Sequence, residues 1–266
     1  MMKKWICVVL VLAMAFGLVA CGGGSGSGGG SNSNTTPPPP PPPTAYELYT
    51  RASEALDNAG SMETETTTEM SMRFGEESMD ISMESTIKVV YPENDMELEM
   101  LSTMDVMGTN QETSAYYKGG YYYIQTMGMK MKVPMDLDSI RDTANTQALD
   151  FSEDAVKDQS SDSAEGGTRV TFTLDGSAIA DAMEKQLAGM VDGLGGEGAS
   201  MSFGDISLSA VVGADETMKS IDMAFSFDME MQGESISCDM AMTMVIVRLG
   251  GVSITFPDDL DTYMEY

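Results

Sequence analysis

The feature that most constrains this 266-residue chain is a repeated alternation of apolar and polar residues with a period of two. From residue 62 to residue 74, the even positions carry Met, Thr or Phe, and the odd positions carry Glu, Arg, Ser or Thr. Successive side chains of a strand point to opposite faces of a sheet, so one face is expected to be buried and the other solvated. Comparable alternation marks 79–89, 96–106, 127–133, 170–174, 206–212, 221–231 and 236–246. The pattern predicts about ten antiparallel strands.

Turn residues divide these segments into hairpins. Residues 116–123 carry Gly119-Gly120 at their centre, which is typical of a two-residue hairpin turn. Residues 75–76, Gly-Glu, separate two further strands in the same way. The acidic, weakly patterned residues 135–167 predict a loop with one short helix, and 252–256 predict a short edge strand.

Two segments have the spacing of amphipathic helices. Thr44 is placed to cap the first helix, and Glu47 completes a capping box three residues later. Gly60 is placed to end that helix. The apolar positions are Leu48, Ala52, Ala55 and Leu56 in the first helix, and Ile179, Met183, Leu187 and Met190 in the second.

The amino terminus has the organisation of a bacterial lipoprotein signal peptide. Lys3 and Lys4 precede an apolar stretch, residues 5–18, that is short for a membrane-spanning helix. Residues 18–21, Leu-Val-Ala-Cys, match a lipobox, so 1–20 predict the signal and Cys21 the lipidation site. Acyl chains such as palmitate on Cys21 would anchor the protein stably. We expect it at the extracytoplasmic face of the cell membrane, on a Gram-positive surface, attached by this lipid alone.

Residues 21–44 predict a tether between the anchor and the folded part. Only Gly, Ser and Asn occur in 22–34, and 37–43 are seven prolines. The first composition favours a flexible coil and the second a stiff polyproline II rod, each spanning about 20 Å. We therefore expect a single folded domain, residues 45–266, held away from the membrane.

Composition excludes several classes of function. The chain has 42 acidic and 14 basic residues, which makes nucleic acid an implausible partner. It contains no histidine, and only Cys21 and Cys238 remain after the signal is removed. Ser-His and Cys-His nucleophile systems are therefore absent, and so is an internal disulfide. We expect no catalytic residue, no cofactor and no His-based metal site.

The apolar face of so wide a sheet must be covered. About ten strands at ~4.8 Å each would span nearly 50 Å, whereas two helices of ~10 Å shield less than half of that width. The sequence therefore predicts an α+β fold, mostly antiparallel, in which a strongly curved single sheet wraps around one or two helices. Such a half-barrel leaves room for an apolar cavity.

Methionine is the most abundant apolar side chain, with 27 residues, and it admits three interpretations. It can fill an irregular core, or it can line an adaptable pocket for an acyl chain or similar ligand. Thioethers also bind Cu(I), and residues 127, 129 and 131, or 240, 242 and 244, have alternate-residue spacing. Alternation of core residues gives the same spacing.

The lipobox, the tether, the opening helix, the Met-rich strands and the Tyr-Tyr-Lys-Gly-Gly-Tyr-Tyr-Tyr hairpin at 116–123 together resemble a family of uncharacterised Gram-positive lipoproteins. Their fold is similar to the LolA-like half-barrel shared with LppX- and LprG-type mycobacterial lipoproteins. This resemblance implies a curved sheet with a hydrophobic pocket and lipid handling. Many such proteins have a Trp after the Tyr hairpin, where this chain has 127–133 without one.

The leading hypothesis is a non-enzymatic surface lipoprotein that binds a lipid or another apolar small molecule between sheet and helices. The alternatives are an interaction or sensory module with a filled core and a cell-surface protein partner, and a Cu(I)-binding lipoprotein. The candidate cavity residues are Met70, Met72, Met83, Met100, Met129, Met183, Leu187, Phe225, Phe227, Met240 and Met242.

Overall fold

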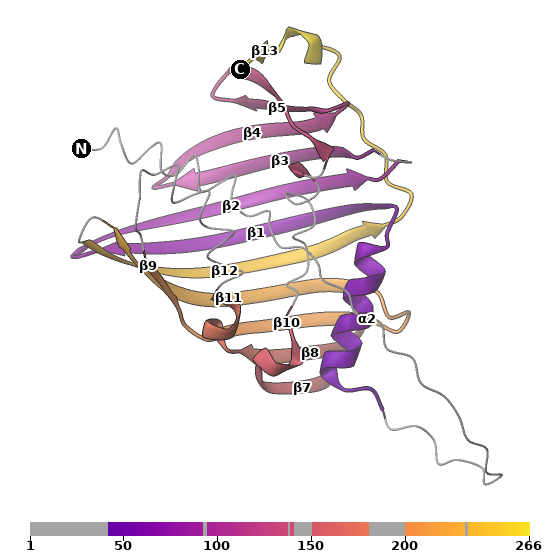
Figure 1. Ribbon diagram of the computed structural model, residues 1–266, viewed down its shortest axis with the longest axis vertical. Coiled ribbons are helices and arrows are strands. Elements are labelled where there is room, and N and C mark those ends of the chain that lie inside the picture. The colour runs from indigo at the N-terminus through magenta and orange to yellow at the C-terminus, as the bar shows by residue number, and fades with distance from the viewer. Residues whose placement is uncertain (1–41, 93–94, 138, 141–150, 181–199, 232–233) are drawn as a thin grey trace, which may run out of the picture.

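Long antiparallel strands dominate the computed structural model, which describes residues 42–92, 95–137, 139–140, 151–180, 200–231 and 234–266 (Figure 1). Within these residues one complete α-helix precedes a thirteen-stranded sheet. The elements are α2 (Ala45–Asp57), β1 (Ser61–Phe74), β2 (Glu77–Val90), β3 (Glu97–Val106), β4 (Thr109–Lys118), β5 (Tyr121–Thr126), β6 (Met129–Pro134), β7 (Val156–Ala164), β8 (Gly167–Leu174), β9 (Ser200–Phe203), β10 (Ile206–Gly213), β11 (Met218–Met231), β12 (Glu234–Leu249) and β13 (Met264–Glu265).

The sheet is open and joins two meanders through its centre. Its strand order is β13-β6-β5-β4-β3-β2-β1-β12-β11-β10-β8-β7, and β9 pairs with β11 outside this path. All pairs are antiparallel except β13 with β6. At the centre β1 pairs with β12, which sets Met70 opposite Met240. The predicted class, mostly antiparallel β, is therefore confirmed. The sheet has thirteen strands, more than the roughly ten that the alternation predicted.

The hairpin turns follow local sequence closely. Gly119 and Gly120 connect β4 to β5 with φ of 59° and 82°, the left-handed conformation that a tight hairpin requires. Gly75 has φ of 62° between β1 and β2. Met127 also has a positive φ, 50°, and lies in the turn before β6. The expectation that Met127 belongs to a strand is thus wrong, because the alternation there continues through the turn.

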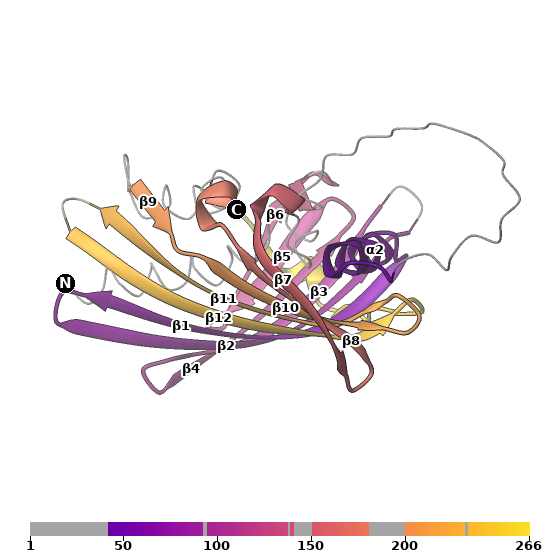
Figure 2. The same cartoon turned by 90° about the horizontal axis from the view of Figure 1, so that it is seen from below.

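Helix α2 begins as predicted and ends earlier. Thr44 and Glu47 form the capping box, in which the Thr44 hydroxyl accepts the Glu47 N–H at 3.1 Å. The C-cap is Asn58 rather than Gly60, and the Asn58 backbone N–H donates to the Glu54 carbonyl. The buried face consists of Ala45, Tyr49, Ala52 and Leu56. It packs mainly over β7, β8, β10 and β11, on the concave side of the bent sheet (Figure 2).

Two predictions for the less regular segments are wrong. Residues 156–164, expected in a loop, form edge strand β7 on β8. Nearly all of β7 is exposed, so neither face required apolar residues and no alternation marked the strand. Residues 252–256 form no strand, whereas β13, farther along, pairs with β6. A two-residue strand is too short to carry a periodic signal.

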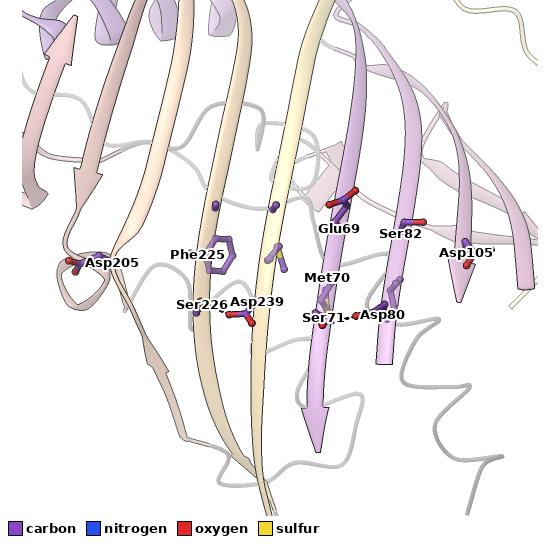
Figure 3. A pocket seen from close by; sticks show the side chains of 14 residues that line it. Glu69, Met70, Ser71, Asp80, Ser82, Asp105, Asp205, Phe225, Ser226 and Asp239 are labelled. Atoms are coloured by element: carbon purple, nitrogen blue, oxygen red, sulfur yellow. Dashed lines mark hydrogen bonds between the residues drawn. The ribbon is translucent and has the colours of Figure 1, made fainter. Parts of the chain in front are cut away.

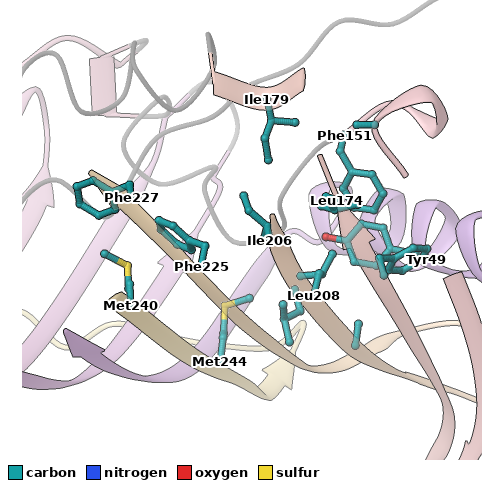
Figure 4. Packing of buried hydrophobic residues seen from close by; sticks show 14 of the residues in the cluster. Tyr49, Phe151, Leu174, Ile179, Ile206, Leu208, Phe225, Phe227, Met240 and Met244 are labelled. Carbon is teal, nitrogen blue, oxygen red and sulfur yellow. The ribbon is translucent and has the colours of Figure 1, made fainter. Parts of the chain in front are cut away.

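Two apolar clusters lie on the concave face. The larger packs α2 and Ile179 against the inner residues of β8, β10, β11, β12 and β1 (Figure 4). The smaller joins Val89, Leu98 and Tyr117 to Ile140.

Residues 176–180 are helical, which confirms the start of the second predicted helix. Wrapping of the whole sheet around helices is not confirmed, because α2 mainly covers the β7–β11 part. No helix among the described residues has the length and hydropathy needed to cross a membrane.

Candidate functional site

The inner face of the four central strands β2, β1, β12 and β11 is the candidate site. Strand alternation places Met70, Met240 and Phe225 in one row across β1, β12 and β11. The next row contains Met72, Cys238 and Phe227 in the same order. All six side chains are buried in the larger cluster. The result is a continuous sulfur-rich and aromatic surface.

The structure brings most of the predicted cavity residues together. Met70, Met72, Phe225, Phe227 and Met240 belong to the larger cluster, and half-buried Met83 packs against it. Half-buried Met242 lies on the same face, opposite Thr68 of β1 and Met223 of β11. These residues come from four strands and share the inner face.

Four of the candidates lie elsewhere or outside the described residues. Met100 is a half-buried residue of β3 and packs against the smaller cluster. Met129 is 51% exposed at the start of β6 and belongs to neither cluster. Met183 and Leu187 lie outside the residues that the structure describes. The sequence-derived set therefore spans three separate parts of the molecule.

Two buried hydroxyls on β1 were missed by the sequence reasoning. Thr64 is fully buried and Thr68 is 3% exposed, yet neither side-chain oxygen has a hydrogen-bond partner among the described residues. The sequence did contain a signal for these two hydroxyls, because threonine occupies positions of the alternation that are otherwise apolar. Buried polar groups are nearly always hydrogen-bonded, so these two hydroxyls are exceptions among the described residues of this face.

A polar row separates the two clusters along the inner face. Register aligns Thr66 of β1 with Ser85, Ser102, Thr113 and Thr126 on the successive strands β2 to β5. The hydroxyls of Thr113 and Thr126 lie 3.1 Å apart and are hydrogen-bonded. Thr64 and Thr68 flank this row on β1, so the unpartnered hydroxyls border a polar strip between two apolar surfaces.

Two hollows that are lined by described residues lie on the opposite, outer face. One, of about 630 Å³, is lined in part by Met70, Ile81, Phe225 and Met240, which are buried residues of the inner face. A second, of about 660 Å³, lies over β1 to β4. The expected methionine-lined cavity is not one of these two, because outer-face walls are built from the polar positions of the alternation.

Hydrogen-bonded carboxylates form the walls of the first hollow. The Ser71 hydroxyl donates to Asp80 at 2.6 Å, and the Ser226 hydroxyl donates to Asp239 at 2.6 Å (Figure 3). The Ser226 hydrogen bond and the charge of Arg73 lower the pKa of the Asp239 carboxyl. The Asp239 carboxyl therefore stays ionised at neutral pH, and the arrangement resembles an ordinary solvated sheet face.

Two buried ionisable side chains of the described strands keep their protons at neutral pH. Burial raises the pKa of the Cys238 thiol to about 12, so it is protonated at neutral pH. Burial likewise raises the pKa of Tyr122 to about 12. No group of three His, Cys, Asp or Glu side chains within the described ranges is placed to hold a metal ion.

Comparison with solved structures gives low similarity over most of the chain. LprF from Mycobacterium bovis is 13% identical with a TM-score of 0.38, over 80% of this chain and 96% of LprF. The LolA superfamily protein NE2245 from Nitrosomonas europaea is 10% identical with a TM-score of 0.23, over 82% and 97%. No curated protein sequence matched. The model of a family of unknown function, DUF6612, matches residues 44–262, and the chain belongs to that family.

Proposed function

We propose that the chain is a non-enzymatic, membrane-anchored lipoprotein whose inner sheet face binds an amphipathic ligand such as a lipid. The observation that carries this proposal is a wide Met- and Phe-rich surface next to the Thr68 hydroxyl, which is buried without a hydrogen-bond partner among the described residues. The apolar side chains would contact the body of the ligand. The hydroxyl of Thr68, which lies next to these apolar rows, would hydrogen-bond to its polar group.

Methionine suits this role because its side chain is unbranched and adapts to the shape of its neighbours. The central rows carry Met70, Met72 and Met240, next to the rigid rings of Phe225 and Phe227. Binding pockets for small molecules are usually apolar with a few placed polar groups. The inner face has this composition, with hydroxyls as its polar groups.

Anchoring at Cys21 is part of the same proposal and is tested separately. Cys21 lies outside the described residues, so the support is the lipobox at 18–21 and the Gly, Ser and Pro composition that follows. Metabolic labelling with a palmitate analogue should mark the wild-type protein, and Cys21→Ser should remove the label. Labelling that survives this substitution would place the lipid elsewhere.

Ligand binding can be tested with single tryptophan reporters. Trp5 is the only tryptophan, so a fragment of residues 44–266 has none. Met242→Trp would place a fluorophore on the inner face, opposite Thr68. We expect a brominated fatty acid, or a phospholipid with brominated chains, to quench its emission in a saturable manner.

The matched control is Val245→Trp on the same strand. Val245 is 42% exposed and lies on the outer face, aligned with Glu65 and Ser220. Its emission should not respond to the brominated ligand. Equal quenching at both positions, or no quenching at position 242 in a folded protein, would refute binding on the inner face.

A second candidate function, the interaction module, is favoured by the acidic hollow on the outer face. Its walls include Glu69, Asp80 and Asp239, with Asp105 and Asp205 at its margins. Charge complementarity would suit a basic protein surface. Under this alternative, crosslinks to cell-surface proteins would map to the outer face, and the Met242→Trp reporter would be silent.

A further inference from the structure

Three exposed methionines lie at one edge of the sheet, where the apolar core does not account for them. Met127, Met129 and Met264 are 61%, 51% and 67% exposed. Single exposed apolar residues are common on protein surfaces. Here, however, three long thioether side chains lie on or next to β6 and β13, the last two strands at this edge of the sheet.

Strand register brings two of these side chains together with Met131. β13 pairs with β6 in parallel, and Met264 is aligned with Met131. Paired residues project to the same face, with strands about 4.8 Å apart. Met129 lies two residues before Met131 on β6 and shares that face, at roughly 6.6 Å along the strand. Three flexible thioethers can therefore converge above this edge.

Contacts on the opposite face hold β13 in this register. Lys130 pairs with Asp259, and the Lys132 ammonium lies 3.7 Å from the Glu265 carboxylate. The Tyr263 ring packs edge-on against Tyr123, with centroids 5.6 Å apart. Because Tyr263 and Glu265 contact outer-face residues, the alternation along β13 directs Met264 to the inner face.

These ion pairs also remove an electrostatic obstacle to binding a cation. Lys130 and Lys132 flank Met131, and an unpaired ammonium there would repel a cation. Each ammonium has a carboxylate from the C-terminal segment as its partner. The carboxylates arrive on the same segment as Met264, so one stretch of chain supplies a third thioether and neutralises both lysines.

We propose that Met129, Met131 and Met264 form a thioether site for a soft monovalent cation, Cu(I) or Ag(I). Soft thioether ligands select cations such as Cu(I), whereas Mg²⁺ and Ca²⁺ prefer oxygen ligands. The site differs from the alternate-residue set 127, 129 and 131, because Met127 lies in the turn and the third ligand comes from the C-terminus. The proposal is independent of apolar-ligand binding on the central strands.

The test uses the full chain in detergent with Cys7→Ser and Cys21→Ser, so that Cys238 is the only thiol. Cu(I) affinity is measured by competition with a chromogenic chelator in the presence of a reductant. Ag(I) serves as a redox-inert probe in NMR spectra of ¹³C-methyl methionine. We expect saturable shifts of the Met129, Met131 and Met264 methyl signals. Met131→Leu and Met264→Leu should each weaken Cu(I) binding by about tenfold or more.

Met107→Leu is the matched control, because Met107 is 77% exposed in the β3–β4 turn, away from β6 and β13. It should leave Cu(I) affinity unchanged. A fourth variant with Cys238→Ser tests whether the buried thiol contributes, and it too should bind normally. The proposal is overturned if Met107→Leu weakens binding as much as Met264→Leu, if all exposed methionine signals shift alike, or if Cys238→Ser abolishes binding.

Discussion

Replacing Thr68 with valine should make the folded protein more stable while weakening ligand binding. The Thr68 hydroxyl is buried without a partner among the described residues. An unsatisfied buried hydroxyl costs about 1–3 kcal/mol, and an additional buried methyl group contributes about 0.8 kcal/mol. Valine has nearly the same shape and prefers strands, so we expect the free energy of unfolding to rise by about 1–2 kcal/mol.

Urea denaturation of residues 44–266 measures this change directly. For a domain of this size, the expected rise corresponds to a Tm increase of about 2–8 °C. Thr67→Val is the control, because Thr67 is exposed on the outer face of the same strand and should change stability by less than about 0.5 kcal/mol. If Thr68→Val instead lowers stability by about 1 kcal/mol or more, the hydroxyl is hydrogen-bonded in solution and the reasoning fails.

The ligand measurement separates a binding role from a purely structural one. If the Thr68 hydroxyl contacts the polar group of the ligand, Thr68→Val should weaken binding about fivefold, the loss of one hydrogen bond of about 1 kcal/mol. The Met242→Trp quenching assay provides the readout, with Thr67→Val again as the control. A more stable variant with unchanged affinity would retain the apolar surface as a site but remove the hydroxyl from it.

Three further predictions concern individual side chains. Burial raises the pKa of Cys238 to about 12, so iodoacetamide at pH 8 should alkylate it slowly in the native protein and rapidly in urea, as mass spectrometry would show. Hydrogen bonds from Thr217 lower the pKa of the Asp215 carboxyl from its ordinary value of 3.8 to about 2. The ionised carboxylate therefore stabilises the folded protein above pH 3.8, and this stabilisation is lost as the pH falls towards 2. Asp215→Asn should therefore lower the Tm at pH 6 and leave it unchanged near pH 2, whereas an equal loss at both values would exclude the charge as the cause. Met107→Asn should raise the free energy of unfolding by about 0.5–1 kcal/mol, because Met107 has φ of 53° and asparagine tolerates this conformation better; no gain in urea denaturation would show that the turn is unstrained.

Much of the candidate site could be predicted from local alternation. A strand that buries one face must place apolar residues at every second position, so Met70, Met72, Phe225, Phe227 and Met240 were assigned to the buried face correctly. Thr64 and Thr68 fell on that face too, but only coordinates showed that their hydroxyls lack partners. Hydrogen-bond satisfaction depends on neighbours from other strands, which one strand's sequence does not specify.

The sequence by itself determined the antiparallel β class, the tight glycine turns, the capping box of α2 and the inner face of each long strand, because all of these depend on residues a few positions apart. Only the tertiary structure decided that β1 pairs with β12 and that β13 returns to β6. It also decided that the exposed segment 156–164 is a strand. Pairing between distant strands depends on complementary surfaces and chain path, and a fully solvated edge strand has no buried face to leave a pattern.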